Sequence, residues 1–400
     1  MTNTAATNRC GIDTVDVSRV EELLRDKTAE DLSHFFSAQE LQDAGEGGSR
    51  LASLAARLAA KEACCKLFPR ETALGQIGAD DFGVRRDAYG APVVLVSPRA
   101  KAVLDRHRVA RINLSLTHSE TSASAMATVD RKETDVPWFG RLFYHLLPFR
   151  RGVVLENLRR VFGETLTEPE INEMAQAYYA HFVRFLIEFV RLPFLSARKR
   201  IELIRVENKE SPLGAWTREK GLLLLTGHFG NWEVATVAGI KQFTEYRGLF
   251  HFVRRPLKPR WFNEFVTRRF QRAGFGSLDK RGSLEKILEL LSQGAIIVYV
   301  FDQHAGKRDG VRVDFFGHPA NTFKSLAILA MSTGAPVIPA SSWREADGTH
   351  VLRFEDPLPL IESEDVSEAI RKNTRAYNAA LERMLLRHPE QWIWMHKRWK

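Results

Sequence analysis

The stretch LLLLTGHFGNWE (222–233) joins an unbroken apolar run to a turn that contains two glycines. Short apolar runs between helical stretches are typical of strands in a sheet that helices cover on both faces. Ile296–Phe301 and Pro336–Ala340 repeat the pattern further along the chain. This part of the sequence therefore predicts an α/β domain in which helices cover a mixed sheet.

The turn after the first run holds a histidine and a glutamate five residues apart. On a continuous helix that spacing is roughly 140° out of register, so the pair can meet only if His228 lies in the turn and Glu233 in the first helical turn. Glu233 could then fix the ring tautomer while the other ring nitrogen takes a proton from an attacking hydroxyl. A purely structural His–Glu pair is the alternative, and the zinc pattern His-Glu-x-x-His is absent.

A second group of charged residues lies near the start of the chain. Asp13 ends a predicted strand, and Glu62 lies inside a helix predicted for Leu51–Leu67. Two carboxylates can converge on a hard cation such as Mg²⁺, which binds oxygen ligands and bridges substrate phosphates. Lys66 follows Glu62 by one helical turn and shares its face. Taken alone, this Glu–Lys pair also fits a solvated salt bridge.

Length and charge limit the classes of protein. A chain of 400 residues is too long for one typical core, and the polar stretch Asp130–Val136 suggests domains at 1–132 and 133–400. The net charge of +9 indicates an anionic partner. Arginines and aromatics mix at 250–272, but no nucleic-acid recognition motif accompanies them, so we expect no nucleic-acid partner. Three cysteines without zinc-ligand spacing fit reduced thiols in the cytoplasm.

Apolar segments are too short to cross a bilayer. The run near Ala295–Phe301 is far below the roughly 20 residues that a spanning helix needs, and Met1–Asn8 is too polar for a secretory signal. The aromatic segment Trp138–Phe149, followed by two arginines, suits an interfacial position. Tyr178–Phe194 is a second aromatic-rich helix that fits either an interface or ordinary core packing. We therefore expect that any attachment to a membrane is peripheral.

Five segments in the first 130 residues resemble, in order and spacing, the holo-acyl-carrier-protein synthase type of 4′-phosphopantetheinyl transferase. They are Gly11–Asp13 with Arg19, Phe36–Glu40, Arg57–Lys66, Gly90–Pro92 and Ser115–His118. The resemblance implies an α+β domain that transfers phosphopantetheine from coenzyme A to a serine of an acyl carrier protein. It implies Asp13 and Glu62 as Mg²⁺ ligands and Lys61, Lys66 and His118 as cofactor-binding residues. Lys66 and His118 would also be catalytic, His118 either binding cofactor phosphate or assisting proton transfer.

Residues 138–400 resemble the lipid A lauroyl/myristoyl acyltransferase family, within the wider lysophospholipid acyltransferase group. The motifs are Gly227–Glu233, Arg254–Pro256, Phe301–Gln303, Phe315–Ala320 with Thr322, Gly334–Pro336 and Pro389–Lys400. The resemblance implies acyl transfer from an acyl carrier protein thioester to a hydroxyl of a lipid acceptor. His228 would be the base and Glu233 its partner, with Arg255 and Asp302 on the substrate side. The family usually begins with a membrane-spanning helix, which this chain replaces by the shorter Trp138–Phe149 segment.

The two resemblances together predict a bifunctional enzyme. One domain would attach phosphopantetheine to a carrier protein, and the other would move an acyl group from a charged carrier to a lipid. Such a pairing fits a dedicated lipid or polyene biosynthetic pathway. The alternative is a lipid A acyltransferase whose N-terminal domain is an inactive docking module for the carrier protein. We also expect the N-terminal domain to form homo-oligomers.

Overall fold

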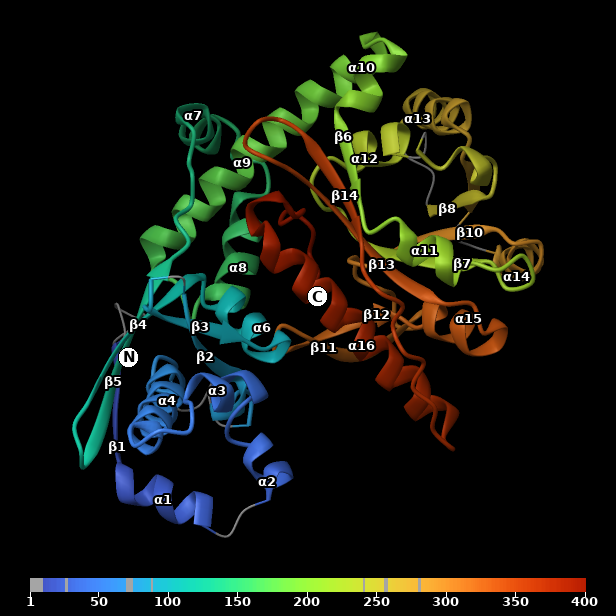
Figure 1. The fold of residues 1–400 in the computed structure, drawn as a ribbon. Coiled ribbons are helices and arrows are strands. Elements are labelled where there is room, and N and C mark those ends of the chain that lie inside the picture. The colour runs from blue at the N-terminus through green and yellow to red at the C-terminus, as the bar shows by residue number, and fades with distance from the viewer. Residues whose placement is uncertain are drawn as a thin grey trace. The chain divides into compact units, whose positions relative to one another are not determined.

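The computed structural model describes residues 10–25, 28–69, 75–87, 89–239, 242–254, 258–279 and 282–400. The chain forms two compact units (Figure 1). One consists of Met1–Thr134 with Phe162–Glu170, and the other of Asp135–Val161 with Ile171–Lys400.

The first unit is built on a three-stranded antiparallel sheet in the order β1-β5-β4. These strands are β1 (Cys10–Asp16), β4 (Val109–His118) and β5 (Ser122–Arg131), and the last two form a hairpin. A separate hairpin pairs β2 (Phe82–Arg86) with β3 (Pro92–Val96). The helices are α1 (Val17–Arg25), α2 (Ala29–Ser33), α3 (Ala38–Asp43), α4 (Arg50–Cys65) and α6 (Pro98–Arg106).

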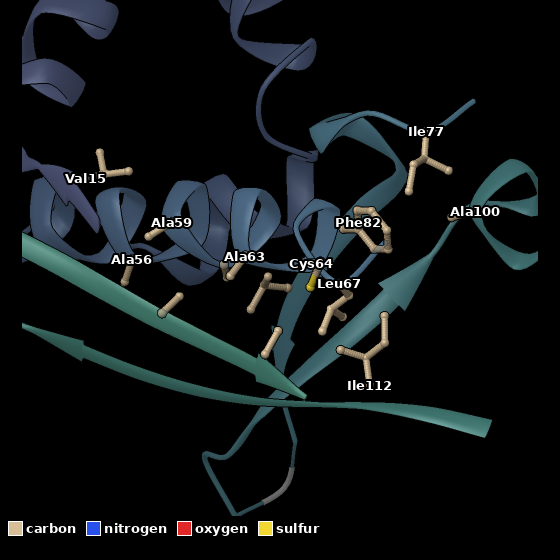
Figure 2. Packing of buried hydrophobic residues seen from close by; sticks show 14 of the residues in the cluster. Val15, Ala56, Ala59, Ala63, Cys64, Leu67, Ile77, Phe82, Ala100 and Ile112 are labelled. Atoms are coloured by element: carbon tan, nitrogen blue, oxygen red, sulfur yellow. The ribbon is translucent and has the colours of Figure 1, made fainter. Parts of the chain in front are cut away.

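Small side chains bring α4 close to this sheet. Ala59 and Ala63 of α4 are fully buried, and Figure 2 shows the alanines of the helix among the packed side chains of this core. A Cβ atom at Gly11 would lie 1.9 Å from the carbonyl oxygen of Ala63, so only glycine permits this approach. The contact brings Asp13, two residues further along β1, beside the end of α4. All three cysteines of the chain are free, and burial raises the pKa of Cys64 to about 12.

The second unit contains a seven-stranded mixed sheet in the order β6-β14-β13-β7-β10-β8-β9. Neighbouring strands are parallel except β13 and β14, which are antiparallel. The strands are β6 (Ile204–Glu207), β7 (Leu222–Thr226), β8 (Phe250–Arg254), β9 (Gly276–Asp279), β10 (Ile296–Val300), β13 (Val337–Arg344) and β14 (His350–Phe354).

Helices cover both faces of this sheet. The residues Leu222–Leu225 of β7 are all buried, although successive side chains point to opposite faces. On one face, Val298 of β10 lines a cavity with residues of α12 (Trp232–Gly239) and α13 (Arg260–Ala273). On the other face, Tyr299 hydrogen-bonds to Ser325 at the start of α15 (Ser325–Thr333). The apolar runs of the sequence correspond to the central strands.

Further helices surround the sheet and its connections. They are α7 (Trp138–Leu146), α8 (Arg151–Phe162), α9 (Glu168–Arg191), α10 (Ala197–Glu202), α11 (Glu210–Ala215), α14 (Leu284–Ser292) and α16 (Val366–Arg387), with a hairpin of β11 (Gly310–Phe315) and β12 (His318–Phe323). Among the helices in the described ranges, none is both long enough and apolar enough to cross a membrane.

Candidate active sites

Strand register brings His228 and Asp302 together. The strands β7 and β10 are parallel neighbours, and Thr226 lies opposite Val300. Each strand ends at that pair, and the chain continues for two residues to His228 on one side and Asp302 on the other. Because parallel strands end at the same edge of a sheet, side chains that follow adjacent strands converge there. The register thus pairs two residues that are 74 positions apart in the sequence.

Three hydrogen bonds fix the Asp302 carboxylate. The ring Nδ1 of His228 lies 2.9 Å from Oδ1, and the backbone N–H of His228 donates to Oδ2 at 2.6 Å. The indole N–H of Trp392 also donates to Oδ2, at 2.9 Å, and the Asp302 side chain is only 1% exposed. The geometry assigns the ring proton to Nδ1 and leaves Nε2 available as a proton acceptor.

The electrostatics of this pair follow from burial and contact. Burial alone would lower the pKa of His228, but the charge and hydrogen bond of Asp302 outweigh it and leave the pKa raised. Burial would raise the pKa of Asp302, but its contacts with His228 and Trp392 leave that pKa lowered. Burial lowers the pKa of the neighbouring His396 to about 4, a shift that Asp302 opposes. Asp302 is therefore a stable carboxylate that holds the basic histidine in position.

The predicted partnership of His228 with Glu233 is wrong. Glu233 does lie in the first turn of α12, as expected, but its Oε2 is 3.4 Å from Nε of Arg269 on α13. The ring nitrogen that Glu233 was expected to hold is bonded to Asp302 instead. Assigning Asp302 to the substrate is also wrong, because the protein itself surrounds its carboxylate. Asp302 takes the positioning role that the sequence analysis gave to Glu233.

An apolar cavity of about 520 Å³ opens beside His228. Its walls come from the sheet and from α9, α12 and α13, and most of its lining is aliphatic or aromatic. Representative lining residues are Phe185, Phe189, Leu224, Trp232, Phe252, Val266, Val298 and Leu352. The His228 ring meets Trp232 edge-on, with ring centroids 4.9 Å apart.

The C-terminal segment packs against the residues that follow His228. Trp392 pairs with Phe229 in an isolated β-bridge, and Gly230 donates to the Gln391 carbonyl at 2.8 Å. The fully buried Arg398 donates to the Asn321 carbonyl at 2.9 Å and stacks over the Phe315 ring. Nothing in the motif Pro389–Lys400 pointed to the hydrogen bond from Trp392 to Asp302. No feature of the linear pattern distinguishes an indole that packs from one that also donates to a buried carboxylate.

In the first unit, Asp13 and Lys66 form an ion pair. Nζ of Lys66 lies 2.6 Å from Oδ1 of Asp13 and donates to the Ile12 carbonyl at 3.0 Å. The Lys66 side chain is 53% exposed, and Glu62, one helical turn earlier, is also exposed. The structure therefore gathers Asp13, Glu62 and Lys66 on an accessible seam between β1 and the end of α4.

Lys61 cannot bind a cofactor in this structure, so that prediction is wrong. Its ammonium is 2.8 Å from Oε2 of Glu40 and donates to the Phe35 carbonyl at 2.7 Å. Both side chains are at least 96% buried, and Glu40 also caps α3 through the Ser37 N–H. Being adjacent to Glu62 in the sequence places Lys61 about 100° around the helix, on the side that faces the core.

His118 is the last residue of β4 and is exposed. Strand register aligns it with Ala123 of β5 and, through that residue, with Val15 of β1. Asp13 is two residues from Val15, so His118 and Asp13 lie on the same face of the sheet with β5 between them. Arg255, the remaining predicted site residue, lies outside the described residues.

The carboxylates of the first unit fit a hard cation in part. Asp13 and Glu62 offer oxygen atoms, which Mg²⁺ prefers. The described ranges contain no cluster of three or more His, Cys, Asp or Glu side chains suited to holding a metal. A magnesium ion here would need further ligands, for which water and substrate phosphates are the usual source.

Comparison with known families assigns the two parts of the chain to two different families. Residues 136–400 match the bacterial lipid A biosynthesis acyltransferases, and residues 9–125 match the 4′-phosphopantetheinyl transferase superfamily. The chain belongs to both families. The predicted fusion is therefore confirmed, and so are the two predicted enzyme classes at the level of family.

Individual relatives match one part of the chain or the other. A holo-[acyl-carrier-protein] synthase of Treponema denticola is 38% identical over 121 residues, which are 30% of this chain and 95% of that protein. A phosphatidylinositol mannoside acyltransferase of Mycolicibacterium smegmatis is 29% identical over 201 residues, 48% of this chain and 64% of that protein. The lipid A biosynthesis lauroyltransferase of Escherichia coli is 26% identical over 269 residues, 65% of this chain and 82% of that protein. The match to the mycobacterial relative thus spans slightly less than two thirds of its length.

Proposed function

We propose that this protein is a bifunctional enzyme of lipid biosynthesis. One unit transfers 4′-phosphopantetheine from coenzyme A to a serine of an acyl carrier protein. The other transfers an acyl group from an acyl carrier protein thioester to a hydroxyl of a lipid acceptor. The observation that carries the second activity is the Asp302–His228 pair beside a large apolar cavity.

In acyl transfer, His228 is the general base. With Nδ1 bonded to Asp302, its Nε2 takes the proton of the acceptor hydroxyl as the oxygen attacks the thioester carbonyl. The tetrahedral intermediate then breaks its carbon–sulfur bond, and His228 returns the proton to the departing thiolate. Asp302 stabilises the imidazolium formed between these steps and keeps the ring oriented.

The apolar cavity suits the hydrocarbon chain of the donor. Its lining is mostly aliphatic and aromatic, and Leu224, Val298 and Leu352 form its wall on the sheet. Moving a hydrocarbon chain from water into such a cavity is favourable by about 0.8 kcal/mol per buried CH₂ group. An acyl chain held there would keep its carbonyl carbon near His228 at the cavity mouth.

In phosphopantetheine transfer, the exposed seam of the first unit binds coenzyme A. Asp13 and Glu62 would hold a magnesium ion, whose positive charge would neutralise the pyrophosphate during the transfer. Lys66 lies beside Asp13 and supplies a second positive charge to the same phosphates. We assign His118 to the same face of the sheet, where it binds cofactor phosphate or accepts the serine proton.

We also propose that α7 attaches the second unit to the inner face of the inner membrane. Trp138, Leu142 and Leu146 recur every four residues and are 76%, 43% and 64% exposed. The opposite face of α7 is held by Tyr144, which is buried and donates to Asn172 at 2.9 Å. An amphipathic helix of this kind lies in the plane of a lipid surface. Ile187 and Val190, near the end of α9, are also exposed. They lie in the second aromatic-rich segment, 178–194, and add to the exposed apolar surface of this unit.

One experiment tests both activities. The purified chain is incubated with coenzyme A, Mg²⁺ and apo acyl carrier proteins from its own gene neighbourhood, and the carriers are weighed by mass spectrometry. The expected result is a phosphopantetheine mass increase, followed by acyl transfer to lipid when an acylated carrier is supplied. Acyl transfer without a mass increase on any carrier would favour the alternative, an acyltransferase with an inactive carrier-docking module. A carrier gene with adjacent ketosynthase genes would support a dedicated lipid or polyene pathway.

A further inference from the structure

A second cavity, of about 550 Å³, lies beside the apolar cavity in the second unit. Its wall is formed mainly by α13, together with Arg200 of α10 and the segment after α9. Trp261, Phe265, Arg268 and Arg272 follow one another at intervals of four, three and four residues, so they share one face of α13. This face presents aromatic side chains at one end of the cavity and guanidinium groups at the other.

Positively charged side chains predominate in this second cavity, which we call the basic cavity. Among the described residues, four arginines line it, Arg200, Arg268, Arg269 and Arg272, against one acidic residue, Glu264. Glu264 lies 3.5 Å from Arg268 and 3.2 Å from Arg260, so it offsets only part of that charge. Arg200 is anchored by donating to the carbonyls of Leu195 and Pro193, both at 2.9 Å.

An ion pair lies between the basic cavity and the apolar cavity beside His228. Glu233 lines the apolar cavity, Arg269 lines the basic cavity, and their charged atoms are 3.4 Å apart. Arg269 is further held by donating to the Phe189 carbonyl at 3.1 Å and by stacking over the Phe189 ring. A ligand in the basic cavity would therefore lie one layer of side chains away from the acyl-chain site.

We infer that the basic cavity binds a phosphate group in the headgroup of the lipid acceptor. This inference rests on the proposed acyl transfer to a lipid. Planar guanidinium groups match the geometry of phosphate oxygens and bind them with two parallel hydrogen bonds. The aromatic end suits the boundary between headgroup and acyl chains, since Trp261 and Phe265 are 70% and 46% exposed. The volume of about 550 Å³ is in the range of cavities that bind small molecules, which suits a lipid headgroup.

The test measures binding directly, by calorimetry, with dihexanoyl phosphatidic acid as the probe and dihexanoylglycerol as the probe without phosphate. Arg268 and Arg272 are exposed, so the variant R268Q/R272Q keeps the buried structure intact. The matched control is R198Q/R371Q, which removes the same charge from exposed arginines outside the cavity. We expect R268Q/R272Q to weaken binding of phosphatidic acid at least tenfold, the control to stay within about twofold, and dihexanoylglycerol to bind none of the proteins through this site.

Acyl transfer provides a second readout. With a phosphorylated acceptor, R268Q/R272Q should raise KM at least tenfold and leave kcat nearly unchanged, because the lost contacts act on binding rather than on the reacting atoms. Equal affinity for inorganic phosphate and phosphatidic acid would overturn the headgroup assignment in favour of a free-anion site. Loss of apo carrier protein binding with unchanged phosphatidic acid binding would overturn it in favour of carrier docking.

The failure of this inference differs from the failure of the proposed function. Wild-type protein that transfers acyl groups but does not bind phosphatidic acid would refute the phosphate site alone. Wild-type protein that binds phosphatidic acid in an R268Q/R272Q-sensitive manner but transfers no acyl group would refute the proposed acyl transfer and leave the phosphate site standing.

Discussion

The two candidate active sites differ in how much of their chemistry the chain supplies. At the acyl-transfer site, Asp302 is 1% exposed and receives hydrogen bonds from His228 and Trp392. At the phosphopantetheine site, Lys66 is 53% exposed, and Asp13 and Glu62 lie beside it on an open seam. At the first site, the protein itself supplies the complete acid–base pair. The second site supplies charged side chains and needs a bound metal ion and cofactor before it can act.

This difference indicates how each site should respond to substitutions. A buried carboxylate held by three donors keeps its geometry without a ligand, so changes there should affect proton transfer directly. Carboxylates of this kind, one half-buried and one exposed, depend on cation binding, so changes there should depend on the Mg²⁺ concentration. The following predictions use that contrast, beginning with the largest expected effect.

Asp13→Ala should abolish phosphopantetheine transfer, because it removes one of the two carboxylates that we propose as Mg²⁺ ligands. Glu62→Ala should lose nearly as much, and chelation of Mg²⁺ should reproduce both losses in the wild-type protein. Mass spectrometry of apo carrier proteins measures the effect. Glu21→Ala, which changes an exposed residue of α1, is the control. Full transfer by Asp13→Ala would show that the metal is held elsewhere.

His228→Ala should slow acyl transfer on the order of 10²–10⁴-fold, the usual contribution of a general base. Phosphopantetheine transfer by the same protein should continue at the wild-type rate. The rates are measured with acylated carrier protein and lipid acceptor, and His145→Ala, on the exposed side of α7, serves as the control. A folded His228→Ala protein with near-normal acyl transfer contradicts the mechanism.

Asp302→Asn should slow acyl transfer by about 10², and the double variant H228A/D302N should lose little more than H228A, because the two residues act as one unit. The charge of Asp302 raises the pKa of His228, and only neutral His228 can act as the base. Removing that charge lowers the pKa, so the acidic limb of the pH–rate profile should move to lower pH. A limb that stays in place, or a larger loss for Glu233→Gln than for Asp302→Asn, would restore Glu233 as the partner.

Lys61→Met should destabilise the first unit by about 3–5 kcal/mol, because it leaves the buried Glu40 carboxylate without its partner. Coenzyme A binding below the unfolding transition should be unchanged. Thermal unfolding and calorimetric titration provide the two measurements. Lys101→Met breaks an ion pair whose lysine is 51% exposed and should change stability by less than about 1 kcal/mol. Weakened cofactor binding by a stable Lys61→Met protein would restore Lys61 to the cofactor site.

L142S/L146S should weaken binding to anionic liposomes about 30-fold, since each leucine loses roughly 1 kcal/mol of interfacial burial and about 1.4 kcal/mol corresponds to a factor of ten. Flotation of the wild-type protein should require anionic lipid and decrease with added salt, because each basic residue near the surface contributes roughly 1 kcal/mol. Both activities measured with water-soluble substrates should be unchanged. Binding that survives high salt and alkaline carbonate would show that the protein has an integral anchor.

Much of the fold could be predicted from local patterns. The strand expected at Leu222–Thr226 is β7, and the helix expected at Leu51–Leu67 is α4 to within two residues. These elements carry strong periodic signals that do not depend on distant contacts. In the aromatic segment Tyr178–Phe194, Tyr178 is buried in the core, as core packing predicts, while Val190 is 61% exposed, and the interfacial position stays a prediction. Domain limits at 1–132 and 133–400 stay a prediction.

The sequence by itself determined which residue types could perform the chemistry: a histidine in a turn after an apolar strand, and acidic and basic residues at set intervals on one helix. Only the tertiary structure decided their partners. Lys61 and Lys66 have the same chemistry, but the rotation of α4 buries one against Glu40 and exposes the other beside Asp13. Likewise, Glu233 is near His228 in sequence, but the parallel register of β7 and β10 brings Asp302 to its ring. Strand register and helix rotation are set by the packing of the whole core, so short-range spacing cannot reveal them.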